Sequence, residues 1–306
     1  FFSPIYTLSD SFITLAMSYL RNITLHKLFI KKDMKTKPNI LLLLIIGFIS
    51  LTSCSSSDSS SGNTNPINSV RIKTLTTQQL IGGVWKNTYK TTNTFEGNNL
   101  MMSASLTQKW NTTISQWENS SQSIYTLYDS AHASQQIIQN WDITTASWTN
   151  QNRHTFTDDT AGNRLKTETE SWTSGNWELT QKGDFIYDGN NYLIRTETSS
   201  WNVATSSWSN PLNKTVYTNN AQGKPILAET YIGSDTTPYS KETLTYDANG
   251  YLLTRFGQFI SMGNWINSYL IEQTNLQNGF ANLINQTNYD LNGNISTQFR
   301  YVYEYY

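Results

Sequence analysis

Aromatic residues recur through most of this chain in two series whose members lie about 30 residues apart. Successive members pair up along the chain, as Trp110 does with Trp117 and Trp201 with Trp208. The first series is Trp110, Trp141, Trp172, Trp201, Tyr231 and Phe259, and the second is Trp85, Trp117, Trp148, Trp177, Trp208, Tyr239 and Trp265. Repetition at a fixed period indicates an architecture in which each unit is one supersecondary element stacked on its neighbours.

A second repeated motif, rich in Asp, Asn and Gly, lies between the aromatic pairs. Its copies are residues 95–100, 187–192, 246–251 and 289–294, with weaker copies at 159–163 and 219–223. Asp, Asn and Gly tolerate positive φ, and here they separate runs of aromatic and β-branched residues, which indicates tight hairpin turns. Each unit is therefore predicted to be strand, tight turn, strand and looser loop.

Period-two alternation predicts half-buried strands within each unit. Between residues 177 and 187, one predicted face carries Trp177, Leu179, Phe185 and Tyr187, and the other carries Glu178, Thr180, Lys182 and Asp184. Residues 192–201 are predicted to form the returning strand, and the loop 202–207 places Trp201 across from Trp208. The resulting fold class is all-β: a continuous antiparallel β-meander of hairpin repeats over residues 70–306. About fifteen strands are expected, with an extra hairpin around Asn278 and Gly279.

The paired tryptophans are the residues with the clearest candidate role. They are Trp110, Trp117, Trp141, Trp148, Trp172, Trp177, Trp201 and Trp208. One interpretation is structural, because cross-strand aromatic pairs stabilise a sheet and fix its register. The other is that a row of exposed rings stacks against sugars and binds glycan. The position of each pair at the equivalent loop of successive units favours the structural role.

The N-terminal part of the chain predicts export and lipid attachment. Lys35 and Lys37 precede a twelve-residue apolar stretch, 40–51, which is the length of a signal-peptide core and too short to span a bilayer. The segment Leu51-Thr52-Ser53-Cys54 follows, and it resembles a bacterial lipobox. That resemblance implies cleavage between Ser53 and Cys54 and acylation of Cys54, which anchors the protein to a membrane.

These features divide the chain into four expected regions. Residues 1–33 fit no part of this exported arrangement and are interpreted as upstream sequence outside the native protein; the alternative is a genuine second transmembrane segment, since residues 12–20 are largely apolar. Residues 34–53 form the signal peptide, and 54–69 form a Ser-rich tether with too few apolar residues to fold. Residues 70–306 form the hairpin-repeat domain.

The Tyr-Asp-x-Asn-Gly turns in a polar, aromatic-punctuated β-meander resemble the YD (Rhs-type) repeats of bacterial cell-surface proteins. The likeness covers most of residues 85–303 and is greatest to repeat-bearing lipoproteins of Bacteroidota. The motif is short, and the 30-residue units with paired tryptophans are longer than typical YD repeats. The resemblance implies an outer-membrane location, lipid-anchored and facing the periplasm or the cell surface. Because residues 301–306 read as a strand rather than a toxin-like cargo segment, a toxin-delivery role is not expected.

Enzyme and metal chemistry have little support in the sequence. His132 and His154 are isolated from each other and from Cys54, so a zinc site of usual spacing is not predicted. Residues 290–294 faintly resemble a calcium loop, but Ile295 and Tyr301 stand where such a loop needs Gly and Glu, so a plain turn is expected. Acidic residues are plentiful, yet no nucleophile elbow, phosphate loop or Cys/His pair occurs. We therefore expect no enzyme activity and no cofactor.

The charge balance of 21 basic against 22 acidic residues argues against nucleic-acid binding. The expected function is a lipid-anchored, non-enzymatic envelope protein that acts as a binding or adhesion scaffold for a glycan or a surface protein. One alternative is a purely structural envelope lipoprotein. Another is an outer-membrane β-barrel, suggested by the alternation of Phe299, Tyr301, Tyr303 and Tyr305. Against the barrel, residues 193–200 are polar on both faces, whereas a lipid-facing strand needs an apolar face.

Overall fold

The computed structural model describes residues 71–275 and 281–306, and within them every regular element is a β-strand. The strands are β1 (Ile72–Ile81), β2 (Val84–Thr94), β3 (Ala104–Asn111), β4 (Gln116–Leu127), β5 (Ala133–Asp142), β6 (Ser147–Asp158), β7 (Arg164–Thr173), β8 (Asn176–Tyr187), β9 (Leu193–Asn202), β10 (Ser207–Trp208), β11 (Asn213–Asn219), β12 (Pro225–Ile232), β13 (Ser240–Tyr246), β14 (Leu252–Ser261), β15 (Asn264–Asn275), β16 (Ala281–Tyr289) and β17 (Ile295–Tyr305). The prediction of an all-β antiparallel meander is confirmed. The signal peptide, Cys54, the Ser-rich tether and the hairpin around Asn278 and Gly279 lie outside the described residues.

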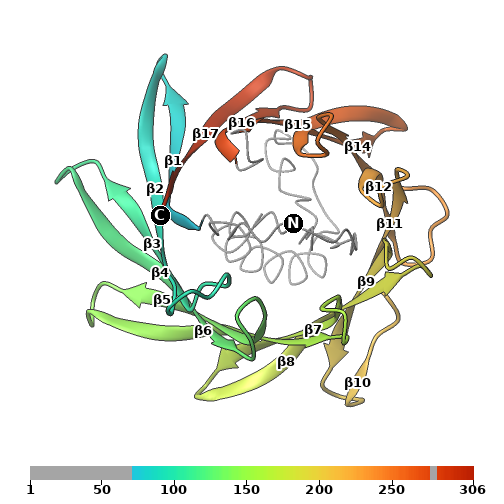
Figure 1. Ribbon diagram of the computed structural model, residues 1–306, viewed down its shortest axis with the longest axis horizontal. Helices are drawn as coiled ribbons and strands as arrows, with labels where there is room; N and C mark the ends of the chain where they lie inside the picture. Colours follow the sequence, from blue (N-terminus) through green and yellow to red (C-terminus); the bar gives the residue numbers. More distant parts are fainter. Residues whose placement is uncertain (1–70, 276–280) are drawn as a thin grey trace, which may run out of the picture. The chain divides into compact units, whose positions relative to one another are not determined.

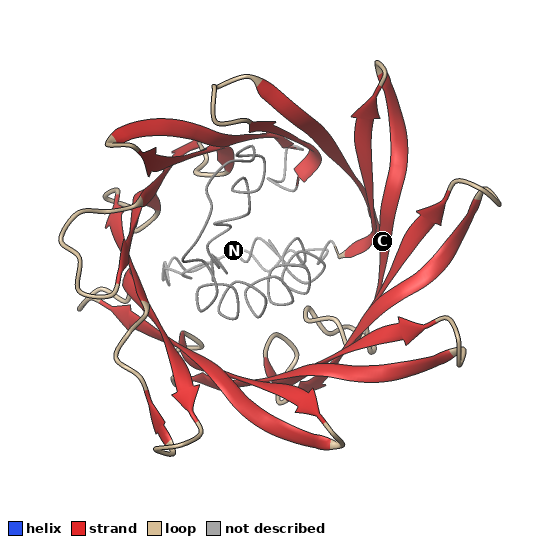
Figure 2. Ribbon diagram, turned by 180° about the vertical axis from the view of Figure 1, so that it is seen from behind, coloured by secondary structure: helices blue, strands red, loops and turns tan. Residues whose placement is uncertain are grey.

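The sheet closes on itself. The repeat pattern in the sequence did not predict this closure. Strand β1 pairs on one side with β2 and on the other with β17, so the first and last described strands are neighbours (Figure 1). Strand β10 pairs only with β9, while β11 also pairs with β9 and continues the ring. Sixteen strands therefore form a closed barrel rather than an open-ended array, and no helix covers it among the described residues (Figure 2).

A β-bulge in the second strand interrupts the alternation in five hairpins, and further register shifts lie at strand ends beside other turns. In β8 the partners of Thr169 and Glu170 are Gln181 and Leu179, so Thr180 is the additional residue, and its hydroxyl donates to the Thr169 carbonyl at 3.1 Å. Equivalent bulges lie in β2, β4, β6 and β15. The predicted faces of residues 177–187 were therefore wrong: Lys182 shares the face of Trp177, and Phe185 lies on the opposite face. A bulge shifts the alternation by one residue and bends the strand.

The two faces of the barrel wall differ in burial. Nearly all of the buried side chains lie on one face, although the described sheet is a single layer, and the other face is half-buried or exposed with the exception of buried Ser199. Because side chains converge on the concave side of a closed sheet and diverge on the convex side, we assign the buried face to the lumen. This lumenal face includes Leu75, Thr91, Ser105, Thr107, Ser123, Gln136, Ile138, Asn152, His154, Thr169, Tyr217, Ala228, Leu244, Ile284 and Tyr301.

The two rims of the barrel have different connections. One, here the tip rim, carries the tips of β1–β2, β3–β4, β5–β6, β7–β8, β9–β10, β12–β13, β14–β15 and β16–β17. The hairpins β1–β2, β3–β4 and β5–β6 splay away from the barrel axis (Figure 1). The opposite turn rim carries the motif copies at 159–163, 188–192, 220–224 and 247–251. The copy at 290–294 lies on the tip rim, because an odd number of strands separates it from the copy at 247–251.

Five copies of the turn motif share one hydrogen-bond pattern. In each, an Asp or Asn side chain accepts the backbone N–H groups two and four residues ahead, as Asp247 does from Asn249 at 2.9 Å and Tyr251 at 2.8 Å. The same bonds form around Asp159, Asp188, Asn220 and Asp290. The fourth residue of each turn has positive φ. The weaker copies in the sequence thus form the same turn as the strong ones, and side-chain hydrogen bonds explain the Asp290 turn without an ion.

Neighbouring copies of this turn pack against one another along the turn rim. A Cβ added to Gly223, whose φ is +74°, would lie 2.2 Å from the Tyr192 ring of the preceding turn. Gly293 has a similar φ of +80°, but a Cβ there would meet nothing within 4 Å. The two glycines share a backbone requirement, and only Gly223 also makes room for a neighbouring side chain.

Replacing each glycine by alanine separates these two effects. Gly293→Ala is expected to lower the free energy of unfolding by about 1–2 kcal/mol, the cost of a side chain in the left-handed region. Gly223→Ala should cost about 1–3 kcal/mol more, because the Tyr192 ring must move. Urea denaturation of the two variants measures both values. Equal losses would contradict the packing of adjacent turns.

The assignment of the lumenal and outer faces can be tested by substituting two adjacent residues of β17. Tyr301 is 1% exposed, its burial raises its pKa, and its hydroxyl donates to Gln286 Oε1 at 2.8 Å, whereas Val302 is 40% exposed. Tyr301→Ala is expected to destabilise the barrel by about 3–5 kcal/mol, as for other buried aromatic residues. Val302→Ala is the matched control and should change stability by no more than about 0.5 kcal/mol. A larger effect at Val302 than at Tyr301 would reverse the assignment.

Candidate functional site

The tryptophan pairs lie on the outer face, next to the tip rim. Trp110 is directly opposite Trp117 in the ladder, with ring centroids 5.0 Å apart in an edge-to-face arrangement. The pairs Trp141–Trp148, Trp172–Trp177 and Trp201–Trp208 repeat this geometry at 4.9, 4.9 and 5.0 Å. We call this surface, with the single rings Trp85 and Trp265, the tryptophan face. It contains all ten tryptophans of the chain.

A cation from the adjacent hairpin covers the second ring of most units. Lys90 lies over Trp117 with its Nζ 5.2 Å from the ring centroid, and the guanidinium of Arg153 lies 5.0 Å from Trp177. The same arrangement occurs for Lys182 over Trp208, Lys241 over Trp265 and Arg300 over Trp85. Each such contact is worth about 0.5–1 kcal/mol at an exposed site and joins one hairpin to the next.

Amide side chains form a second row beneath the tryptophans. Within the β5–β6 hairpin, Gln139 donates to Asn150 at 2.8 Å, and it accepts a bond of 2.6 Å from Gln122 on β4. Equivalent Gln–Asn pairs link Gln78 to Asn87, Gln108 to Asn119 and Gln258 to Asn267. Gln122 occupies the place that a cation takes in the other units. These pairs mark the same register position in four hairpins, and the equivalent position in β7–β8 holds Glu170 and Leu179.

The exposure of the rings bears on whether they could stack against sugars. Every ring of the tryptophan face is half-buried except Trp172, which is 38% exposed. Stacking on a sugar needs a free aromatic face, but the second rings lie between a partner ring and a cation. The geometry of the tryptophan face therefore suits its structural role better than direct stacking on glycan.

Two predicted aromatic pairings, Phe259 with Trp265 and Tyr231 with Tyr239, differ in the structure. Phe259 is opposite Ile266, and Trp265 is opposite Ile260, so the phenylalanine belongs to the other face. Tyr239 precedes β13, and its N–H donates to the Thr230 carbonyl, so it is not in register with Tyr231. Aromatic spacing alone did not reveal these shifts, because one residue of difference in loop length changes the face on which a ring lies.

The sequence analysis missed the aliphatic side chains at the hairpin tips. Ile143 and Val203 are each 74% exposed, and Met262 is 99% exposed, all in tight connections beside the tryptophans. Further exposed aliphatic residues of the tip rim are Ile81, Val84, Ile114, Ile232, Leu291 and Ile295. Among the tips, only that of β7–β8, made of Ser174 and Gly175, has none. The signal was an apolar residue in an otherwise polar loop, recurring once per unit.

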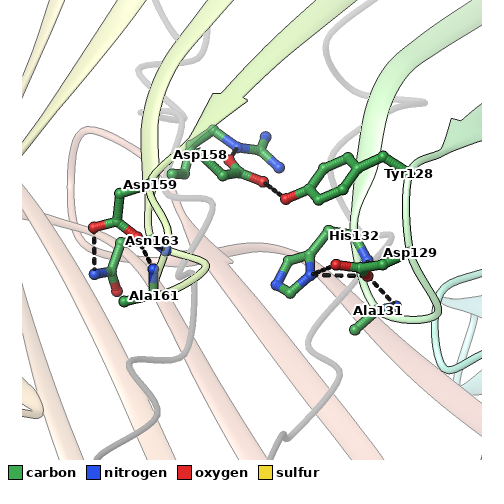
Figure 3. A network of polar contacts seen from close by, with 9 residues as sticks. Tyr128, Asp129, Ala131, His132, Asp158, Asp159, Ala161 and Asn163 are labelled. Carbon is green, nitrogen blue, oxygen red and sulfur yellow. Dashed lines mark hydrogen bonds and ion pairs between the residues drawn. The ribbon is translucent and has the colours of Figure 1, made fainter.

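A polar network joins two turns on the opposite rim (Figure 3). The Tyr128 hydroxyl donates to Asp158 Oδ2 at 2.8 Å, and Arg164 pairs with the same carboxylate. Burial and the Asp158 bond raise the pKa of Tyr128 to about 12. His132 Nδ1 lies 2.9 Å from Asp129 Oδ2. Each carboxylate of the cluster bonds to groups of its own turn or of the neighbouring turn. Turn structure therefore explains the cluster.

Glu242 of β13 and Arg255 of β14 form a charged pair on the lumenal face. Arg255 Nη2 donates to both carboxylate oxygens of Glu242, at 3.0 and 2.9 Å, and the Tyr269 hydroxyl donates to Glu242 Oε1. Burial raises the pKa of nearby Tyr217 to about 12, so this phenol is neutral at physiological pH. The pair links adjacent strands across the lumenal wall.

The described residues contain no group of three His, Cys, Asp or Glu side chains placed to hold a metal ion. His154 is buried on the lumenal face, where it lies opposite Gln136 of β5 and its Nδ1 lies 3.0 Å from Thr169 Oγ1. In the part of the chain that is described, no helix has the length and apolarity needed to cross a bilayer.

No protein-family model and no curated protein matches the chain. Among solved structures, a protein of unknown function from Bacteroides fragilis has 18% identity, with 42% of this chain and 91% of that chain covered, and a TM-score of 0.35. A porin-like protein from Bacteroides uniformis has 8% identity, coverage of 77% and 98%, and a TM-score of 0.45. The Tc holotoxin pore of Photorhabdus luminescens has 12% identity, coverage of 72% and 15%, and a TM-score of 0.26. Likenesses this weak carry no conclusion about what the chain does.

A double-mutant cycle on Trp201 and Trp208 tests the structural role of the pairs. Trp201→Ala and Trp208→Ala should each lower the free energy of unfolding, and the double variant should cost less than both losses added. The expected coupling is about 0.5–1.5 kcal/mol, the value of an edge-to-face aromatic pair beyond its area burial. Thermal or urea unfolding of the four proteins measures it. Additive losses would show that the two rings do not support each other.

Proposed function

We propose that this chain is a non-enzymatic, lipid-anchored protein of the bacterial outer envelope. Its closed barrel would act as a binding scaffold, with the contact surface at the tip rim and the adjoining tryptophan face. The observation that carries the proposal is the concentration of all ten tryptophans and most strongly exposed aliphatic side chains at one rim. The lipobox-like segment ending at Cys54 and the YD-like turns support the envelope location.

The outer wall is charged along its height, which supports a barrel standing in water. Arg153 Nε donates to Glu170 Oε2 at 2.6 Å, and Lys182 Nζ lies 2.7 Å from Asp184 Oδ2, all on the outer face. Similar pairs join Arg195 to Glu197 and Lys166 to Glu168. A lipid-facing barrel needs an apolar band, and one Arg or Lys at mid-bilayer costs about 2–4 kcal/mol. We therefore infer attachment to the membrane rather than insertion of the wall.

An outer-membrane-spanning barrel is the second candidate. Closure into sixteen antiparallel strands agrees with it better than with an open array, and bacterial barrels have an even number of strands. The row of tryptophans near one rim also has the position of an interfacial aromatic girdle. A lipid-spanning wall would have to accommodate the charged pairs of the outer face, so fractionation decides between the two candidates.

Removing the acceptor cysteine tests both candidates. In cells, Cys54→Ala should abolish acylation, seen as loss of the lipid mass. The variant should leave the membrane pellet after high salt and alkaline carbonate, which release proteins that do not span the bilayer. The unsubstituted protein, which keeps its acyl chains, should stay until detergent is added. If the unacylated variant remains in the carbonate pellet, the spanning barrel is the better interpretation.

A further inference from the structure

We propose that the tip rim is a membrane-interface surface, whose exposed aliphatic side chains enter the headgroup region of a phospholipid bilayer. This inference deepens the proposed function by naming the partner of the contact surface. It rests on three features of the rim: the distribution of its aliphatic residues, the position of the tryptophans, and the cations beside them.

The aliphatic residues of the rim are distributed as separate points around a ring. Ile114, Ile143, Val203 and Met262 each occupy the tip of a different hairpin, and Ile232 and Leu291 continue the series. All six residues lie at the tips of different hairpins, so they form separate apolar points rather than one contiguous patch. A protein partner would need a matching pocket for each tip, whereas a bilayer presents a continuous apolar phase to all of them at once.

The most exposed aliphatic side chains at these tips are more exposed than the aliphatic side chains near the opposite rim. Met262 is 99% exposed, and Ile143 and Val203 are 74% exposed. Near the turn rim, Leu100, Leu165, Ile226 and Leu253 are 41%, 40%, 38% and 36% exposed. Leaving a large aliphatic side chain in water at the end of a tight turn gives up about 1.5–3 kcal/mol of burial, and the recurrence of this loss around one rim points to an external apolar partner.

The tryptophans and cations lie where an interface would place them. In three bulged hairpins the paired rings are one residue from each end of the turn, as Trp110 and Trp117 are from the turn at 112–115. Trp is enriched where a bilayer meets water, because its indole is apolar with one polar N–H. Lys90 on the same face adds a cation that suits anionic headgroups, whereas Arg153 and Lys182 are paired with Glu170 and Asp184. Inserting the tips would bring the tryptophan face to headgroup depth.

Intrinsic fluorescence tests this placement directly, because all ten tryptophans are beside the tip rim. The mature protein, purified with its Cys54 lipid and reconstituted into phosphatidylethanolamine–phosphatidylglycerol vesicles, is compared with and without lipids brominated in the upper acyl chain. Bromine quenches only nearby indoles. We expect at least about twofold quenching and a blue shift, since burial of the rings removes them from water.

A triple variant, Ile143→Asn with Val203→Asn and Met262→Asn, should lose most of this quenching while the protein stays anchored. The matched control, Leu165→Asn with Ile226→Asn and Leu253→Asn, alters exposed aliphatic residues near the opposite rim and should quench like the parent. Near-ultraviolet circular dichroism of the tryptophan pairs shows whether each variant keeps its fold. If the triple variant unfolds, the single Met262→Asn change, at a fully exposed side chain, gives the same comparison.

Two results would overturn the proposal. Absence of quenching in the parent protein, or equal quenching in the tip variant, would mean that the rim does not enter the bilayer. Tip-dependent self-association in sedimentation without vesicles, together with no quenching, would assign the rim to a second copy of the chain. Failure of the anchor is seen separately as absence of the acyl mass on Cys54. In that case, flotation of the same chain with vesicles, compared between the parent and the tip variant, tests the rim alone.

Discussion

The pairing of β1 with β17 is the contact on which the rest of the architecture depends. Their ladder runs from Ile72 opposite Tyr305 to Gln79 opposite Phe299, and Thr74 donates to Glu304 across 230 residues of sequence. Without this pairing, both strands would present free backbone groups along an edge, which is a hazard for aggregation. With it, the single sheet acquires an inside, where Tyr301 and its neighbours shield one another in the absence of any described second layer.

The bulges divide each of the five bulged hairpins into two parts. Below the bulge, the wall carries small polar side chains such as Ser123 and Thr169 toward the lumen and ion pairs toward the outside. Above it, the hairpin bends away from the axis and carries its rings and its apolar tip. A bulge increases local twist and redirects side chains, so one inserted residue per hairpin both places the tryptophans outside and separates the tips from the wall.

Much of the local structure could be predicted from the sequence. The turns around Asp188 and Asp247, the return strand that ends at Trp201 and the facing of four tryptophan pairs all follow from short-range patterns. The bulge at Thr180 could not be predicted, because no residue type distinguishes an extra residue in a strand from its neighbours. Closure could not be predicted either, since it depends on accumulated curvature and on two strands at opposite ends of the chain. The tips were missed because an isolated Ile143 or Val203 in a loop is unremarkable until all the loops share one rim.

Closure by recurring neighbour contacts has a consequence for how such a molecule can vary. Neighbouring hairpins meet through contacts that recur around much of the ring: a cation over an indole in five units, a glutamine in its place at Gln122, and a turn residue against a glycine at Tyr192 and Gly223. A unit of about 30 residues that keeps these contacts could be gained or lost without altering its neighbours, and each event would change the ring by two strands. Because the diameter of a barrel grows roughly in proportion to its strand number, the width of the lumen in this architecture is set by the count of repeats rather than by any particular side chain.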